Sequence, residues 1–422
     1  MKKLPGDANS NCSVLMITYY FPPMGGNGVQ RTLKFVKYLM EFGWQSHILT
    51  VKETTSLKDQ TYMDELPGSL PIIRTPILSL PTRLPWKLRS FVSRWFLIID
   101  EQIGWLPFGI SAGLKIIKQG DIKVIYSTST PYTTHLIAHS LHKLTQLPWV
   151  ADFRDPWIDN PFIKFPTALH RRINERLEKN IFTTAERVIL NTEVSRQHYI
   201  DKYFQLPVEK FITIPNGYDQ VDIECINKRN QINSSFTIVH LGSLYRKTRS
   251  SEFFLKALNE AIRDGRLLPD KIRVLLIGNI DKETPGIVRE LQLSKKVELL
   301  GYIPHRQALD YLFSADLLLL LPYYGVGAEL SIPAKIYEYL ASRKPILCLA
   351  ESGACSDLVL KARAGSIVPP TDTNKIADEI VRLYHLWEKG AINFEPNIDL
   401  ISSFERRKLA GQLSDLFNGL IT

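Results

Sequence analysis

The chain has 422 residues, of which 45% are apolar and 23% charged, and it carries a formal net charge of +9 at neutral pH. This composition excludes a disordered or fibrous protein, and the length predicts two domains. The basic balance favours acidic ligands: phosphates, nucleotides, nucleic acid or an anionic membrane surface.

Strand-like apolar runs alternate with amphipathic helical patterns along the first half of the chain. Residues 13–21 (SVLMITYYF) predict a strand, which a glycine loop and a helix (VQRTLKFVKYLMEFG) follow. Further strands are predicted at SHILTV, KVIYST, WVADF and RVILNT, with helices around THLIAHSLHKL and RRINERLEKNIF. Such alternation is typical of parallel sheets with helices on both faces.

A second alternating series follows a polar break at residues 227–235. It predicts strands at FTIVHLGSL, IRVLLIGN, VELLGYI, DLLLLLPY and PILCLA, with helices at SEFFLKALNEAI and ALDYLFSA and a third from about Pro333 that ends before PILCLA. We therefore expect an α/β protein with two doubly wound, Rossmann-like domains facing a cleft, residues 1–225 and 226–398. A C-terminal helix over 399–422 is expected to pack back on the first domain.

Neither the cysteines nor the N-terminus indicates secretion. Cys12, Cys225, Cys348 and Cys355 have no zinc-site spacing, which favours thiols in a reducing compartment. The start, MKKLPGDANSNC, lacks the apolar region of a signal peptide, and no window reaches the ~18 apolar residues of a membrane span. We expect a cytoplasmic protein.

The loop after the first strand, PPMGGNGVQR, lies where ligands bind in open α/β sheets. Gly25 and Gly26 would let backbone N–H groups approach a phosphate or sugar, and we assign the neighbouring Asn27 to the binding of a polyhydroxylated substrate. Arg31 stands where a dinucleotide fingerprint has its third glycine, which favours an anionic ligand other than NAD. A plain turn is the alternative.

Charged residues also end the strand in WVADFRDPW. Carboxylates accept hydrogen bonds from sugar hydroxyls, so we predict that Asp152 binds a polyhydroxylated substrate and that Arg154 and Asp155 belong to the catalytic site. His135, after STSTPYTT, is predicted on the same side as a catalytic or acceptor contact. The alternatives are a structural Arg–carboxylate network and a structural histidine.

Two stretches of the second predicted domain carry charges at strand or helix ends. HLGSLYRKTRS places Arg246, Lys247 and Arg249 where they could neutralise a diphosphate, although a solvated basic turn is the alternative. A helix from about Pro333 would put Lys335 and Glu338 on one face. Taken alone, that pair reads as a solvated ion pair.

Together these stretches resemble the family 4-like glycosyltransferases, which have the two-domain type B fold (GT-B). The resemblance implies transfer of a sugar from a nucleotide-sugar to a saccharide or lipid-linked acceptor, with retention of configuration. It implies no metal site, no cofactor besides the donor substrate, and a role in bacterial surface polysaccharide or glycolipid synthesis. The matching pieces, in the family's order across about residues 13–370, are YYFPPMGGNGVQR, STSTPYTTH, PWVADFRDPW, IPNGYD, HLGSLYRKTRS, SADLLLLLPY and IPAKIYEYLASRKPIL.

The resemblance also implies roles for single residues. Glu338 looks like the family's ribose-binding glutamate, with Lys335 close to the diphosphate, and the stretch from Arg246 to Arg249 looks like the basic pair on the diphosphate. Gly25 and Gly26 look like the loop that closes over the donor diphosphate, and Asn27 and Asp152 are assigned to the acceptor. Eight residues separate Glu329 from Glu338, where the family often has seven, so Glu329 is assigned to the donor on resemblance alone. Ser243 stands where the family usually has arginine.

Other functions remain open from the residues. A sugar-nucleotide epimerase of the same fold and a non-catalytic nucleotide-sugar-binding partner subunit are the alternatives to a transferase. Nucleic-acid binding is disfavoured, because the basic residues are dispersed and the aromatics form no stacking platform. The segment 84–109 mixes basic and aromatic residues and could lie at the inner face of a membrane, which ordinary domain packing explains equally well.

Overall fold

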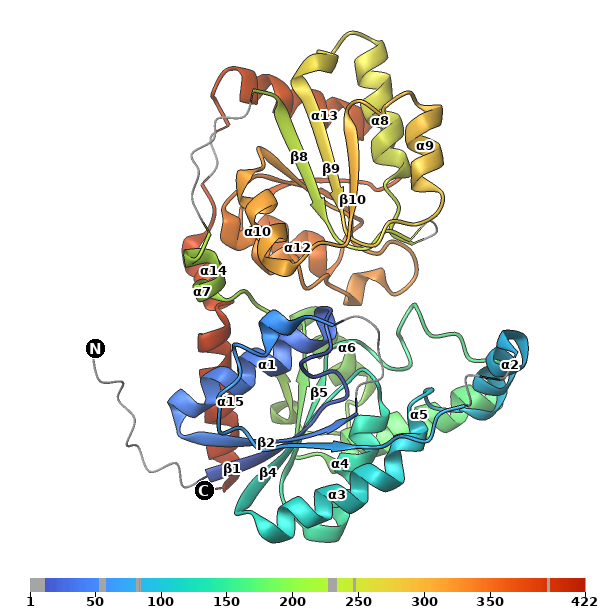
Figure 1. The fold of residues 1–422 in the computed structure, drawn as a ribbon, viewed down its shortest axis with the longest axis vertical. Coiled ribbons are helices and arrows are strands. Elements are labelled where there is room, and N and C mark those ends of the chain that lie inside the picture. The colour runs from blue at the N-terminus through green and yellow to red at the C-terminus, as the bar shows by residue number, and fades with distance from the viewer. Residues whose placement is uncertain are drawn as a thin grey trace. The chain divides into compact units, whose positions relative to one another are not determined.

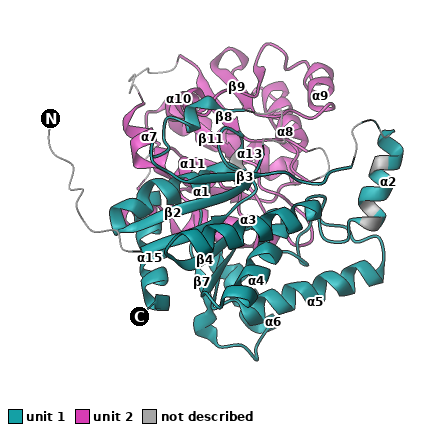
Figure 2. Cartoon of the chain, turned by 60° about the horizontal axis from the view of Figure 1, so that its bottom comes forward, with its two compact units in different colours: residues 1–216, 406–422 teal, residues 217–405 magenta. Residues whose placement is uncertain are grey.

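The structure, a computed structural model, describes residues 12–52, 58–80, 83, 85–226, 234–245, 248–392 and 395–421, without the side chains of Asn27, Arg89, Arg94 and Phe96. The chain divides into two compact units, residues 1–216 with 406–422 (unit 1) and residues 217–405 (unit 2), coloured separately in Figure 2. Each unit is a parallel α/β sheet with helices on both faces, as predicted (Figure 1).

The sheet of unit 1 has the order β3-β2-β1-β4-β5-β6-β7 among the described residues. Its strands are buried on both faces: Leu15 and Ile17 of β1 pack into one hydrophobic layer, and Val14 and Met16 into the other. The strands are β1 (Cys12–Ile17), β2 (Trp44–Val51), β3 (Ile72–Thr75), β4 (Ile122–Thr128), β5 (Trp149–Phe153), β6 (Arg187–Leu190) and β7 (Phe211–Thr213). The helices are α1 (Asn27–Leu39), α2 (Trp86–Phe96), α3 (Leu106–Gln119), α4 (Thr133–Thr145), α5 (Ala168–Thr184), α6 (Glu193–Lys202) and α15 (Arg406–Ile421), with short 3₁₀ turns η1 (Met40–Phe42), η2 (Gln60–Tyr62), η3 (Ile103–Trp105) and η4 (Val208–Lys210).

The sheet of unit 2 has the order β10-β9-β8-β11-β12-β13 among the described residues. Phe236 and Ile238 of β8 face one layer of its core, and Val239 and Leu241 the other. The strands are β8 (Phe236–Leu241), β9 (Ile272–Ile277), β10 (Val297–Gly301), β11 (Leu317–Leu320), β12 (Ile346–Leu349) and β13 (Gly365–Val368). The helices are α7 (Gln220–Glu224), α8 (Glu252–Arg263), α9 (Thr284–Glu290), α10 (His305–Ser314), α11 (Ile336–Ser342), α12 (Ala354–Lys361), α13 (Thr373–Glu388) and α14 (Ile398–Ser403), with 3₁₀ turns η5 (Pro269–Lys271) and η6 (Ala328–Leu330).

Each sheet has one topological switch point. In unit 1, β1 lies between β2 and β4, and in unit 2, β8 lies between β9 and β11. Successive strands are therefore added on one side first and on the other side afterwards. The loops that leave the carboxyl ends of the two strands at such a point diverge, which makes this the usual ligand site of a doubly wound sheet.

The unit boundaries differ from the predicted ones, 225/226 and 398/399. The backbone N–H of Tyr218 donates to the Phe404 carbonyl at 3.1 Å, so the two chain segments that cross between the units pair inside unit 2. The predicted helix over 399–422 is two helices: α14 belongs to unit 2, and α15 belongs to unit 1, where Phe417 packs edge-on against Trp44 with ring centroids 5.1 Å apart.

Among the described residues, no helix is both long enough and apolar enough to cross a membrane.

Candidate functional site

The glycine loop of unit 1 leaves the carboxyl end of β1 at the switch point. Gly26, with φ of 99°, precedes the first residue of α1. A Cβ on Gly28 would come within 3.0 Å of the Tyr20 ring, so the loop backbone lies tightly on that ring. Gly25 and Gly26 thus lie at the predicted edge of the sheet, while their contact with a donor stays a prediction. The side chain of Asn27 lies outside the described residues.

Arg31 and Asp152 form a buried ion pair. Arg31 donates from Nε and Nη2 to the two carboxylate oxygens, both at 2.9 Å, and the two side chains are 2% and 0% exposed. Burial acts to raise the pKa of Asp152, but the guanidinium, together with the Tyr126 hydrogen bond and the Arg154 charge, holds that pKa below its usual value. The same carboxylate accepts hydrogen bonds from the hydroxyls of Tyr126 at 2.5 Å and Thr128 at 3.0 Å.

These contacts correct two predictions. Four hydrogen bonds reach the Asp152 carboxylate, three at Oδ2 and one at Oδ1. Because the side chain is also 0% exposed, the structure does not present it to a sugar hydroxyl. Arg31 donates its hydrogen bonds to the Asp152 carboxylate and to the carbonyls of Ile214 and Pro215, at 2.9 and 2.7 Å, instead of to an external ligand. The structural Arg–carboxylate network, the alternative reading, describes both residues.

Arg154 and Asp155 follow β5 at the same edge of the sheet. Arg154 donates to the carbonyls of Gly28, at 2.7 Å, and of Ser129, which joins the loop after β1 to the loop after β4. Burial lowers the pKa of Arg154, and the neighbouring Asp155 carboxylate acts in the opposite direction. Asp155 itself is exposed. Arg154 therefore holds the two loops at the switch point, and Asp155 presents a carboxylate beside them.

His135 lies in the first turn of α4 and is fully buried. Trp149 donates from Nε1 to the Ser127 hydroxyl at 2.8 Å, and that oxygen lies 2.8 Å from His135 Nδ1. Phe153 packs on the ring with centroids 4.3 Å apart. The ring is enclosed on these sides, as the structural reading expects, but its buried Nε2 atom has no hydrogen-bond partner among the described residues. A direct contact of His135 with an acceptor therefore stays a prediction.

In unit 2, Glu338 lies in α11 with 8% of its surface exposed. Its Oε1 atom is 2.8 Å from Nε2 of His305, the first residue of α10, and its Oε2 atom is 3.9 Å from the ammonium of Lys335. The predicted pair thus meets on one face, although the helix begins at Ile336 and not at Pro333. His305 was not predicted, because a lone histidine after a strand gives no local sign of its partner.

The switch point of unit 2 lies at the carboxyl ends of β8 and β11. His240 Nδ1 donates to the Leu319 carbonyl at 2.9 Å, and this bond joins the two strands. Burial lowers the pKa of His240 to about 4, and the positive charges of Arg249 and Lys335 add to that shift. Arg249 and Lys335, both predicted to bind the donor, therefore lie close enough to His240 to shift the pKa of its ring. Arg246 and Lys247 lie outside the described residues.

Two glycines keep these loops close to the sheet. A Cβ on Gly278, after β9, would lie 2.2 Å from the Gly242 carbonyl, so the ends of β8 and β9 can approach only without side chains. A Cβ on Gly353 would lie 2.6 Å from the Cα of Glu329, so η6 can pack this closely on the start of α12 only because residue 353 has no side chain. Glu329 is exposed, and its assignment to the donor stays a prediction.

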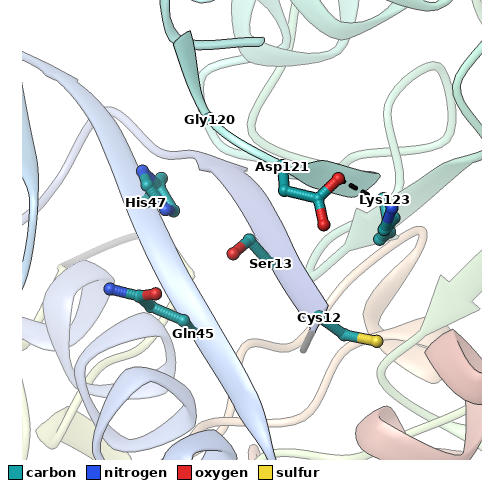
Figure 3. Close-up of a pocket in the computed structure, with 7 residues that line it drawn as sticks. All are labelled: Cys12, Ser13, Gln45, His47, Gly120, Asp121 and Lys123. Carbon is teal, nitrogen blue, oxygen red and sulfur yellow. Dashed lines mark ion pairs between the residues drawn. The ribbon is translucent and has the colours of Figure 1, made fainter. Parts of the chain in front are cut away.

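Hollows elsewhere lie at the opposite edges of the sheets. Figure 3 shows one at the amino ends of β1, β2 and β4, where Lys123 and Asp121 form an ion pair of 2.7 Å. Another, at the amino ends of β11 and β12, is lined by Asp316 and Arg343 among others. Since ligands of doubly wound sheets bind at the carboxyl ends of the strands, neither hollow is the candidate site.

The two buried histidines predict a loss of stability in acid. Burial lowers the pKa of His135 from 6.5 to about 3. The unfolded chain therefore takes up this proton first, and stability that is complete above pH 6.5 is lost as the pH falls towards the folded-state pKa. At about pH 4.5 the loss should reach about 2–3 kcal/mol for this histidine.

Urea unfolding of the wild type and of His135→Asn at about pH 7 and about pH 4.5 checks this expectation. Because carboxylates also contribute to acid unfolding, the quantity compared is the change between the two pH values. The loss of stability between about pH 7 and about pH 4.5 should be smaller by about 2–3 kcal/mol in His135→Asn than in the wild type, whatever the variant's stability at neutral pH. An identical change in both proteins would contradict the buried, neutral state of His135.

Comparisons with known proteins identify the fold first. Sucrose-phosphate synthase from Thermosynechococcus elongatus has a TM-score of 0.69 at 16% identity, over 97% of this chain and 99% of that one. HepE from Anabaena, in complex with UDP, has a TM-score of 0.66 at 14% identity, over 97% and 100%. These likenesses establish the GT-B fold.

The family follows from two sequence matches. The chain matches the model of Glycosyltransferase Family 4 over residues 26–221 and that of Glycosyl transferases group 1 over residues 235–385. It therefore belongs to the family 4-like glycosyltransferases, and the predicted resemblance is confirmed.

Two curated relatives match part of the chain. TuaC of Bacillus subtilis, provisionally described as a teichuronic acid biosynthesis glycosyltransferase, is 29% identical over 36% of this chain and 34% of its own length. WcaL of Escherichia coli, provisionally described as a colanic acid biosynthesis glycosyltransferase, is 27% identical over 31% of this chain and 34% of its own length. The matches thus span about a third of these relatives.

Proposed function

We propose that this protein transfers a sugar from a nucleotide-sugar to a saccharide or lipid-linked acceptor in the synthesis of a bacterial surface polysaccharide or glycolipid. The observation that carries the proposal is the position of Glu338, held between His305 and Lys335 beside the switch point of unit 2. The partial matches to enzymes described for teichuronic and colanic acid synthesis support the choice of pathway class.

Unit 2 has the groups that a nucleotide-sugar requires. The Glu338 carboxylate is an acceptor for the vicinal hydroxyls of a ribose, and His305 fixes its orientation through the 2.8 Å contact. Lys335 and Arg249 supply positive charge for a diphosphate. HepE was crystallised with UDP, which makes UDP the first diphosphate to test here.

The proposed reaction needs no protein nucleophile. The acceptor hydroxyl oxygen forms a bond to the anomeric carbon on the face from which the nucleoside diphosphate leaves. The bond between that carbon and the phosphate oxygen breaks, and the departing phosphate oxygen takes the proton of the acceptor hydroxyl. Configuration is then retained, and catalysis consists of positioning and of stabilising the leaving group. Asp155 orients the acceptor in this proposal.

A thermal-shift panel without added metal tests the donor assignment. The ligands are UDP, GDP, CDP, ADP and NAD, applied to the wild type, to Glu338→Ala and to Glu290→Ala, a matched loss of an exposed glutamate at the end of α9 in the same unit. A ligand at 100 times its Kd adds ~2.7 kcal/mol of stability. One nucleoside diphosphate should stabilise the wild type and Glu290→Ala but not Glu338→Ala.

The other outcomes separate the rival functions. Stabilisation by no diphosphate would overturn the donor assignment. Binding without turnover in the presence of any acceptor would leave a non-catalytic binding subunit, and conversion of the nucleotide-sugar without an acceptor would identify an epimerase. NMR of the product anomer tests retention, and turnover in the presence of a chelator tests whether a metal is needed.

A further inference from the structure

The helix α2 of unit 1 presents large apolar side chains to solvent. The exposed fractions are 74% for Trp86, 46% for Leu88, 53% for Phe91 and 40% for Trp95. We call these four side chains the α2 face, and we infer that this face docks the protein on an anionic phospholipid membrane. The inference goes beyond the proposed reaction, because docking needs no turnover.

The spacing puts most of the α2 face on one side of the helix. Leu88, Phe91 and Trp95 follow one another at intervals of three and four residues, so they form a single stripe. The rings of Phe91 and Trp95 lie 6.2 Å apart. Trp86 opens the helix. Tryptophan and phenylalanine are the residues that insert at the boundary between headgroups and acyl chains.

The C-terminal end of α2 and the residues that follow it are hydrogen-bonded to α5 and α4 of unit 1. His170 of α5 donates from Nε2 to the Trp95 carbonyl at 3.1 Å, and Asn174 donates to the Ile98 carbonyl at 2.8 Å. Asp100 accepts from the backbone N–H of Thr133, at 2.9 Å, in the first turn of α4. Figures 1 and 2 show α2 at the margin of this unit, beyond the end of α5. The stripe is therefore presented by a helix whose C-terminal end is held in place.

The charge around this face is mainly positive, although the exposed Glu101 accepts a hydrogen bond from Ser93 of α2 at 2.5 Å. Residues 83–98 contain four basic and no acidic residues, and residues 160–173, which lead into the first turn of α5, contain three basic and none acidic. Arg83, Lys87, Lys164 and Arg172 are exposed. Two further exposed apolar residues, Phe162 at 57% and Leu169 at 64%, lie in the second segment.

Aromatic side chains set among basic ones match the surface of an anionic bilayer, in which the aromatics enter the interface and the cations pair with phosphates. A partner protein with an apolar site would not require this excess of positive charge. The segment that follows α2 contacts the first turn of α4 through Asp100, at the carboxyl edge of the unit 1 sheet. Docking would therefore bring that edge towards a lipid-linked acceptor.

Vesicle binding by the full chain tests the inference. Sedimentation with phosphatidylglycerol vesicles is compared with phosphatidylcholine vesicles for the wild type, Phe91→Ser, Lys87→Gln and the control Phe204→Ser. Phe204 is 83% exposed and follows α6, outside both segments. We expect binding to phosphatidylglycerol only, weakened at least about tenfold by Phe91→Ser and about fivefold at low salt by Lys87→Gln, and unchanged by Phe204→Ser.

Fluorescence of the wild type gives a second readout that does not depend on a folded variant. Trp44, Trp105, Trp149 and Trp157 are at most 1% exposed, and the half-buried Trp387 belongs to unit 2, so brominated phosphatidylglycerol should quench chiefly Trp86 and Trp95. Trp86→Phe should lose a large part of this quenching while it keeps binding. Equal binding to both lipids, an equal effect of Phe204→Ser, no quenching, or self-association through this face without vesicle binding would each overturn the inference.

Discussion

We expect Arg249→Met to lower the turnover (kcat) of glycosyl transfer by ~10²-fold, the usual cost of removing one preorganised group that stabilises charge in the transition state. Arg249 and Lys335 both act on the pKa of His240, so both positive charges lie near the carboxyl end of β8. The backbone N–H of Tyr324 donates to the Thr248 carbonyl at 3.0 Å, which ties the loop of Arg249 to the loop after β11. Negative charge grows on the leaving diphosphate as its bond to the sugar breaks, and a cation held there stabilises it.

Initial rates of nucleoside diphosphate release at saturating donor measure this effect separately from donor binding. Arg263→Met is the matched control, because it removes the same charge from the exposed last turn of α8, the helix that begins just after Arg249. Its kcat should equal that of the wild type. A rise in donor KM with an unchanged kcat in Arg249→Met would mean that the arginine binds substrate and transition state equally, and would refute a role in leaving-group stabilisation.

Local sequence patterns predicted what depends on neighbours along the chain. The alternation of apolar runs correctly predicted two parallel sheets. The spacing of Lys335 and Glu338 correctly predicted that the two side chains meet, since three residues make nearly one turn, although Lys335 lies just before the helix. The segment that contains α2 was noted for its aromatics and basic residues. Their exposure could not be predicted, because the same composition also suits a helix packed in a core.

Side-chain partners far apart in sequence could not be predicted. Arg31 and Asp152 are 121 positions apart, and His305 and Glu338 are 33 apart, so these contacts exist only once neighbouring strands and helices are in register. Charged residues at strand ends serve a ligand or one another, and only burial and the number of hydrogen bonds distinguish the two. That is why Asp152 was assigned to an acceptor, whereas its carboxylate is buried and paired with Arg31 inside unit 1.

Breaking this internal pair is expected to cause the largest loss of stability. Arg31→Met leaves a carboxylate buried without its cation, and such a loss costs about 3–5 kcal/mol. Asp152→Asn should cost a similar amount, because it leaves the guanidinium without a counter-charge. The free energy of unfolding can be followed by tryptophan fluorescence, which reports mainly on unit 1, since six of the seven tryptophans lie in it.

The control is Arg171→Met, which removes an exposed pair with Glu175 in α5, 56% and 43% exposed. Surface pairs of this kind contribute about 0–1 kcal/mol, so the control should unfold almost like the wild type. The acceptor hypothesis makes the opposite prediction for Asp152→Asn: a raised acceptor KM at unchanged stability. Because Arg31 also holds the carbonyls of Ile214 and Pro215, its loss should in addition loosen the last residues of unit 1, and faster proteolysis near residue 216 would reveal that loosening.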